Sequence, residues 1–82
     1  MTIGAWSRPV CINAGKHGAT RCLVGDTARA VDVLTYHWPQ RSGPKYVAAC
    51  RACRDVLNRN APPETARELF REAALEAGIL EE

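Results

Sequence analysis

Long hydrophobic runs, internal repeats and low-complexity segments are all missing from this 82-residue sequence. No apolar stretch approaches the roughly 18 residues that a membrane-spanning helix needs, so we expect no contact with a membrane. The first eight residues have neither the basic start nor the apolar centre of a secretory signal. We therefore expect a cytoplasmic protein whose four cysteines remain reduced thiols.

Residues typical of catalytic sites are also scarce. The chain has two histidines, His17 in an expected turn and His37 on an expected helix, and neither has catalytic neighbours close in the sequence. A chain of this length buries only about 60–65% of its unfolded surface, which leaves little room for a deep enclosed pocket. We expect a protein that is not an enzyme and has no cofactor.

The composition is that of an ordinary globular domain, with 46% hydrophobic and 24% charged residues. The net charge of +2 conceals an asymmetry, because residues 1–60 balance to +6 and residues 61–82 to −4. The asymmetry has two interpretations: a basic surface that meets an acidic partner, or an acidic helix packed beside a basic one. We favour the second, which is the more frequent arrangement.

Two short segments rich in β-branched residues predict a β-hairpin near the N-terminus. They are residues 10–13 and 20–24, and the segment between them contains Gly15 and Gly18, which permit a tight turn. Residues 1–7 are expected to form a flexible arm, in which Trp6 is the one side chain large enough to pin it. Because a two-stranded sheet is marginal alone, we expect one face of the hairpin to cover the helices.

The turn sets the register of this hairpin. A two-residue loop at residues 16–17 would place Val10 opposite Leu23 on the inner face. The same register would place Cys11 opposite Cys22 on the outer face. A disulfide between them is sterically allowed, but it is not expected in a reducing compartment.

Three helices follow from their capping residues and from apolar periodicity. The first is expected to begin at Asp26 and to end before Pro39, because proline disfavours helical geometry in the preceding residue. The second is expected to begin at Pro44, where the missing N–H of proline has no bond to lose. The third should open at residues 62–64 and end at Gly78, which can adopt the left-handed conformation of a helix cap.

These segments predict an α+β fold, in which a two-stranded antiparallel hairpin packs on three α-helices. One small domain is expected over residues 8–80, with residues 81–82 as an acidic tail end. The core is expected where the apolar side chains recur at strand or helix spacing. Its expected members are Val10, Ile12, Leu23, Leu34, Trp38, Tyr46, Ala49, Cys53, Leu57, Leu69, Phe70 and Ala73.

The Cys-x-x-Cys motif formed by Cys50 and Cys53 invites a redox or metal interpretation. A redox motif of this kind places its first cysteine at an exposed helix N-terminus, where the helix dipole lowers the pKa of the thiol. Here both cysteines lie about two turns into the second helix and point along its apolar stripe, as small buried hydrophobic residues do. A zinc site is a less favoured alternative because its ligands lack the usual pairwise spacing. They would come from Cys11, His17, Cys22, Cys50 and Cys53.

A basic cluster in and around the second helix offers an alternative function. Such clusters bind nucleic-acid phosphates by releasing counterions. The low aromatic content of 6% and the absence of helix-turn-helix spacing argue against this role. The candidate basic binding surface consists of Arg41, Lys45, Arg51, Arg54 and Arg59.

The chain also resembles a bacterial family, most specifically at Trp38-Pro39 and at the closing stretch of residues 73–79. The family is catalogued as domain of unknown function 982 and occurs mostly in nitrogen-fixing soil bacteria and their relatives. The likeness covers roughly residues 8–80. It implies a ββααα domain and brings no activity with it. Cys53 matches a position that is often cysteine in the family, whereas the other three cysteines match no family position.

We therefore expect a non-catalytic accessory or protein-interaction module. Its expected partner is another protein, and it would self-associate if the open edge of the hairpin extended a sheet across a homodimer. Nucleic-acid binding through the basic face of the second helix is the alternative. A zinc-binding domain is the third.

Overall fold

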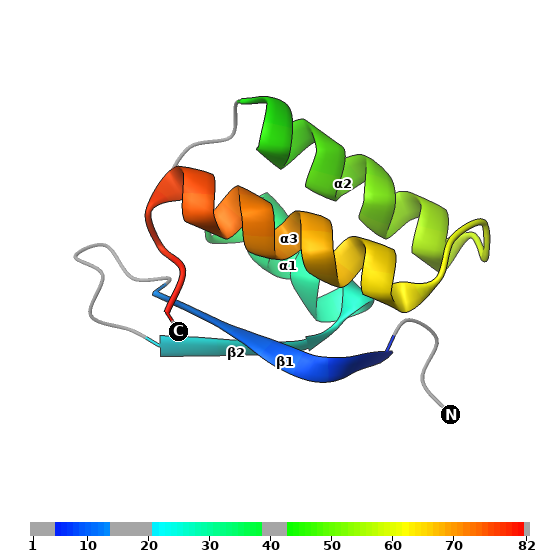
Figure 1. Cartoon of the computed structure of the whole chain (residues 1–82), viewed down its shortest axis with the longest axis horizontal. Coiled ribbons are helices and arrows are strands. Elements are labelled where there is room, and N and C mark those ends of the chain that lie inside the picture. Colours follow the sequence, from blue (N-terminus) through cyan, green and yellow to red (C-terminus); the bar gives the residue numbers. More distant parts are fainter. Residues whose placement is uncertain (1–4, 14–20, 39–42, 82) are drawn as a thin grey trace.

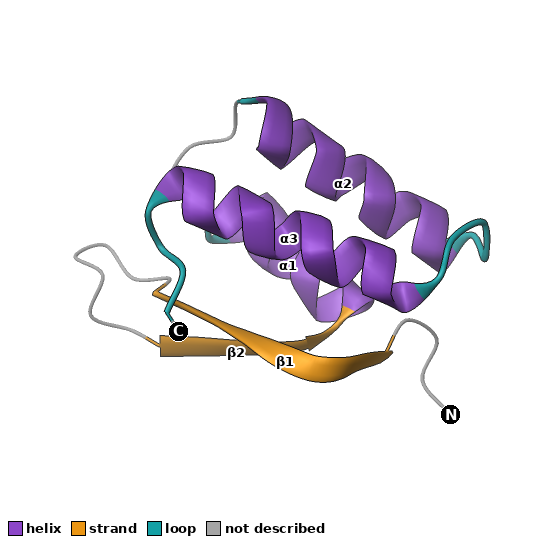
Figure 2. Cartoon of the chain, in the orientation of Figure 1, coloured by secondary structure: helices purple, strands orange, loops and turns teal. Residues whose placement is uncertain are grey.

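A two-stranded antiparallel sheet and three helices follow one another along the chain, which confirms the predicted α+β arrangement (Figure 1). In this computed structural model the sheet lies on one side of the helices (Figure 2). Helix α3 packs on β1 and α1 packs on β2, while α2 contacts α1 and α3 on the side away from the sheet. The elements are β1 (Ala5–Asn13), β2 (Arg21–Asp26), α1 (Thr27–Tyr36), α2 (Pro44–Leu57) and α3 (Pro63–Ala77).

The structure describes residues 5–13, 21–38 and 43–81. In this part of the chain no helix is long and apolar enough to cross a membrane. Several predictions fall outside these ranges, namely those on residues 1–4, on the hairpin turn with Gly15, His17 and Gly18, and on Pro39 and Arg41.

Strand β1 begins at Ala5, so the prediction of a loose arm is wrong for residues 5–7. The cause is Trp6, which is only 8% exposed and has its ring centroid 5.5 Å from that of Phe70. Its Nε1–H donates a hydrogen bond of 3.1 Å to Oγ1 of Thr27. A buried aromatic ring with a satisfied N–H is strongly stabilising, and it holds this end of the strand against the helices.

Ser7 attaches the same strand end to the start of α3. Its backbone N–H donates a hydrogen bond of 3.0 Å to Oε1 of Glu64. Hydrogen bonds from the side chain and backbone of Ser7, with the nearby charge of Arg67, lower the pKa of Glu64. The contact therefore favours the ionised carboxylate, and its stabilising effect is lost as the pH falls through the lowered pKa.

The hairpin register differs by one residue from the prediction. Val10 pairs with Val24, and Cys11 pairs with Leu23. Because side chains alternate between the two faces of a strand, a shift of one residue turns Leu23 outward and Val24 inward. Val24 is fully buried, whereas Leu23 is 64% exposed, so the placement of Leu23 in the core was wrong. Cys11 and Cys22 consequently lie on opposite faces of the sheet.

The C-terminal residues 79–81 run alongside β1, on the edge that β2 does not occupy. The N–H of Asn13 donates to the carbonyl of Ile79 at 2.8 Å, and the N–H of Glu81 donates to the carbonyl of Cys11 at 2.9 Å. The side chain of Glu81 also accepts a hydrogen bond from that of Asn13. Glu81 therefore belongs to the folded domain, which extends past the predicted limit at residue 80, and it covers one end of the β1 edge.

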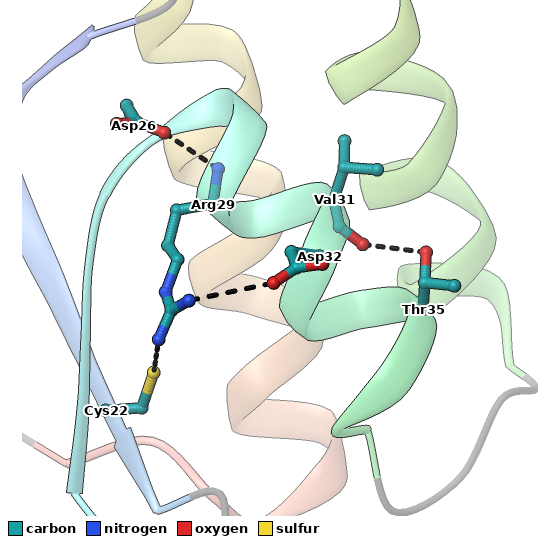
Figure 3. Close-up of polar contacts among 6 residues, drawn as sticks. All are labelled: Cys22, Asp26, Arg29, Val31, Asp32 and Thr35. Atoms are coloured by element: carbon teal, nitrogen blue, oxygen red, sulfur yellow. Dashed lines mark hydrogen bonds and ion pairs between the residues drawn. The ribbon is translucent and has the colours of Figure 1, made fainter.

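Three predicted helix boundaries are confirmed, whereas α1 ends at Tyr36, two residues before the predicted end near Trp38, so that His37 is its cap and not a helix residue. Oδ1 of Asp26 accepts a hydrogen bond of 2.7 Å from the N–H of Arg29 and so caps α1 (Figure 3). Pro44 occupies the first position of α2. Gly78 ends α3 with a φ of +73°, a left-handed conformation that favours glycine.

Helix α2 is capped by a side chain from α3. Gly43, at the cap position, has a φ of +112° and offers no side chain. Oε2 of Glu76 accepts a hydrogen bond of 3.1 Å from the N–H of Lys45, which lies in the first turn of α2. The carboxylate thus meets the positive end of the helix dipole. A Cβ at position 43 would lie 3.1 Å from Oε1 of Glu76, so both the φ angle and the close approach require glycine there.

Phe70 lies at the centre of the core, between the rings of Trp6 and Trp38, at centroid distances of 5.5 and 5.4 Å. The expected core is corrected at Leu57, which is 40% exposed. On a helix that turns about 100° per residue, Val56 takes the inward position and Leu57 lies beside it. Tyr46 and Leu69 are partly buried. The expected core residues that the structure buries are Val10, Ile12, Leu34, Trp38, Ala49, Cys53, Phe70 and Ala73.

Candidate functional site

The predicted basic surface is divided by the fold. Lys45 turns toward α3, where its Nζ lies 3.5 Å from Oε1 of Glu72. Arg51 and Arg54 are exposed, and so is Arg59, which follows the helix with a φ of +63°. In the described part of the chain no carboxylate forms an ion pair with any of these three arginines. The arginines of the predicted basic surface that form no ion pair in the described part of the chain therefore lie in the C-terminal half of α2 and just beyond it.

The ion pair of Lys45 with Glu72 joins two helices that pack side by side. An acidic helix thus lies beside a basic one, as the charge asymmetry of the sequence suggested. The asymmetry is satisfied in part within the fold, and the arginines further along α2 remain exposed without an ion pair in the described part of the chain.

The four cysteines are free thiols in four different settings. Cys53 is fully buried, and burial raises its pKa to about 12, with a further contribution from the neighbouring Cys50. Cys50, Cys11 and Cys22 are half-buried. Among the described residues no group of three or more histidine, cysteine, aspartate or glutamate side chains could hold a metal ion.

We expect Cys53 to be the last of these thiols to be alkylated in the native protein. A pKa of about 12 leaves roughly one molecule in ten thousand as the reactive thiolate near pH 8, and burial also excludes the reagent. Time-resolved iodoacetamide labelling with peptide mass spectrometry measures the rate at each cysteine. Rapid labelling of Cys53, at the rate found in concentrated urea, would contradict the buried position.

Helix α1 has two different sides (Figure 3). On one side Arg29 forms an ion pair with Asp32, with Nη1 3.6 Å from Oδ2, and its Nη2 lies 3.8 Å from Sγ of Cys22. On the other side Val31 and Thr35 lie next to α2, and the hydroxyl of Thr35 donates to the carbonyl of Val31 at 2.8 Å. The charged groups of α1 are therefore engaged away from α2, and the side that approaches α2 is mainly apolar.

A cleft of about 360 Å³ lies between these two helices. Leu34, 1% exposed, forms its floor, and Leu57, 40% exposed, forms part of its rim. Arg54 supplies a positive charge within the same wall as Leu57. The cleft is lined by Val31, Leu34 and Thr35 of α1 and by Cys50, Arg54, Leu57 and Asn58 of α2 and its C-cap. We name this the α1–α2 cleft, and it is our candidate site.

Sequence reasoning missed the cleft because it assigned Leu57 to the core. The sequence nevertheless contained a signal, which is a second stripe of side chains on α2. Cys50, Arg54 and Leu57 follow one another at intervals of four and three residues, and this spacing places them on one helix face. A matching pair on the first helix, Val31 and Thr35, lies four residues apart. Such stripes remain ambiguous until the packing of the two helices shows which one is buried.

Comparison with known proteins supports the fold over nearly the whole chain. The family model described as "Protein of unknown function (DUF982)" matches residues 8–81. No curated protein matches the chain. The NMR structure of the Agrobacterium tumefaciens protein Atu1219 is similar, with a TM-score of 0.76 and 29% sequence identity. The match covers 95% of this chain and 76% of that one.

Proposed function

The chain belongs to the DUF982 family of proteins of unknown function, and from this premise we propose that it binds a protein partner through the α1–α2 cleft. It would act as a small non-catalytic accessory module in the bacterial cytoplasm. The cleft carries this proposal. The fold leaves apolar side chains partly uncovered there, next to charged and amide groups that can orient a partner.

The make-up of the cleft is that of a small protein-binding surface. Interfaces generally combine an apolar centre with a polar rim in which arginine is enriched. Here Leu57 and Val31 provide the apolar part, while Arg54 and Asn58 provide the polar part.

The chemistry of the cleft walls favours binding over catalysis. Among the described residues that line it, the titratable groups are Cys50 and Arg54. An arginine keeps its proton at physiological pH, and a nucleophilic cysteine generally needs a neighbouring base or a helix N-terminus to activate it. Cys50 lies in the middle of α2, and no base stands among the lining residues.

Self-association remains a prediction, now restricted to one edge of the sheet. Residues 79–81 cover β1 at Cys11 and Asn13, so that end of the strand cannot receive a second copy. Strand β2 has β1 as its one neighbour in the described sheet. The other end of β1 is engaged with α3, because the N–H of Ser7 donates to Glu64 and the carbonyl of Arg8 accepts a hydrogen bond from Nε of Arg67. A homodimer formed by sheet extension would therefore use the β2 edge.

Nucleic-acid binding is the weaker alternative. Of its five predicted residues, Lys45 is paired with an α3 carboxylate and Arg41 lies outside the described residues. The rest, Arg51, Arg54 and Arg59, remain exposed near the end of α2. Three arginines are a small footprint for a phosphate backbone, whose affinity grows with the number of contacts.

The variant Leu57→Glu is expected to abolish partner binding and leave the fold intact. A carboxylate at this rim would be desolvated by an apolar partner, which should weaken binding by about tenfold or more. The matched control is Leu75→Glu, at a leucine on α3 that is 63% exposed. Each variant is compared with the unchanged chain in affinity capture from cells that naturally produce the protein, after circular dichroism has verified its fold.

The expected result is a partner that Leu75→Glu retains and Leu57→Glu loses. The opposite pattern, or a partner retained equally by both variants, would show that binding does not use the α1–α2 cleft.

A further inference from the structure

Both walls of the cleft are helices, and this limits the shape of what it accepts. Along α2, Cys50, Arg54 and Leu57 span seven residues, or about 10 Å at 1.5 Å per residue. Across from them Val31 and Thr35 lie one helical turn apart on α1. Rows of side chains at this spacing form ridges and grooves into which the ridges of another helix fit.

An extended peptide would find little to bind in this place. Peptides that bind as strands use the unpaired backbone groups of a sheet edge, together with pockets for alternate side chains. The backbone groups of the cleft walls are instead mostly bonded within α1 and α2. A helix satisfies its own backbone groups and needs only an apolar stripe to enter the cleft.

The one charged side chain among the described lining residues of the cleft is positive, and Asp55, the acidic residue of α2, is not among them. Arg54 lines it and Arg51 lies one turn earlier on α2, and neither has a carboxylate partner in the described part of the chain. The nearest acidic side chain of α1, Asp32, is paired with Arg29 on the side away from α2 (Figure 3). Glu72 of α3 is engaged with Lys45. The cleft thus offers a guanidinium without an ion-pair partner among the described residues, beside an apolar floor.

We infer that the α1–α2 cleft binds an acidic amphipathic helix of a partner protein, with its apolar stripe over Leu34 and Leu57 and a carboxylate on Arg54. This rests on the proposed function and specifies its partner. Arginine and carboxylate groups form two parallel hydrogen bonds, which gain strength where the partner excludes water. Asn58, at the end of the same wall, adds an amide that can donate a hydrogen bond to the partner.

The test is selection from a displayed library of helix-biased and extended random peptides, with the full-length chain as bait. Parallel selections use Leu57→Glu, Arg54→Glu and the control Arg8→Glu, which makes the same charge change on an exposed residue of β1. We expect the unchanged chain and Arg8→Glu to enrich helical peptides with apolar residues at i, i+3 or i+4 and i+7 and a flanking acidic residue. Arg54→Glu should replace that acidic residue by lysine or arginine.

The strongest peptide is then synthesised in acidic form and with lysine in place of its conserved acidic residue. The variant Arg54→Glu should bind the acidic peptide about tenfold or more weakly than the unchanged chain does. The lysine peptide should recover much of that lost affinity in the same variant. Enrichment of extended or basic peptides, or an acidic preference unchanged in Arg54→Glu, would overturn the inference. If Leu57→Glu still abolished such binding, the proposed function would stand. Peptides that bind Leu57→Glu as well as the unchanged chain would count against both.

Discussion

Replacing Phe70 by alanine is expected to remove a large share of the stability of this protein. The ring is fully buried and contacts both Trp6 and Trp38, with centroids 5.5 and 5.4 Å away. Truncating a buried phenylalanine to alanine destabilises a protein by about 3–5 kcal/mol, through lost apolar burial and the cavity that remains. A domain of this size has a total stability of about 4–12 kcal/mol, so the variant should lose a large share of it and approach unfolding only if the total lies near the lower end.

Urea denaturation followed by circular dichroism measures this change in the free energy of unfolding. Leu75→Ala is the control, because its side chain is 63% exposed and its loss should change stability by about 0.5 kcal/mol or less. Phe70→Leu should lie between the two, because it keeps part of the buried volume. A loss of less than about 1 kcal/mol in Phe70→Ala would contradict a core centred on this ring.

The second large effect is expected at Trp6, which lies in the segment that the sequence predicted to be a flexible arm. Trp6→Ala should lower the free energy of unfolding by about 3 kcal/mol, because it removes a buried indole from the face of Phe70. It also removes the hydrogen bond of 3.1 Å to Oγ1 of Thr27. The start of β1 would then be held by its pairing with Asp26 and by the hydrogen bonds that join Ser7 to Glu64 and Arg8 to Arg67.

The variant Trp6→Phe separates the two contributions. It keeps an aromatic ring and loses the indole N–H, so we expect a smaller loss of about 1 kcal/mol. Hydrogen exchange of the backbone amides of β1 provides a second readout, since Trp6→Ala should accelerate exchange most at the start of the strand. Unchanged stability and exchange in Trp6→Ala would mean that residues 5–7 do not belong to the folded sheet.

The features that local chemistry determines were predictable from the sequence. Asp26, Pro44 and Gly78 act within one helical turn of their own positions, and the structure has each helix boundary where they indicate it. The burial of Phe70 and Cys53 also followed from helical periodicity. In each case the deciding interactions involve neighbours in the chain or a single helix face.

The features that depend on packing between distant segments were not predictable in the same way. The choice between Leu23 and Val24 for the inner face depends on a register that slips by one residue without any change in composition. Trp6 finds its place only because Phe70, from α3, lies across from it.

The candidate site was hidden for the same reason. Leu57 sits close enough to the buried face of α2 that a helical wheel places it in the core. Its exposure of 40% follows from where α1 lies, and only the packed structure shows this. The cleft is a property of two helices together, so neither helix alone predicts it.

The central claim is that a protein partner contacts this chain at the α1–α2 cleft. A photo-crosslinking amino acid placed at position 57 tests it most directly, with position 75 on the exposed side of α3 as the matched control, in cells that naturally produce the protein. We predict that a crosslink to one specific protein forms from position 57 and disappears when Arg54→Glu is added, whereas position 75 gives no specific product. A specific partner crosslinked from position 75 and never from position 57 would contradict the claim.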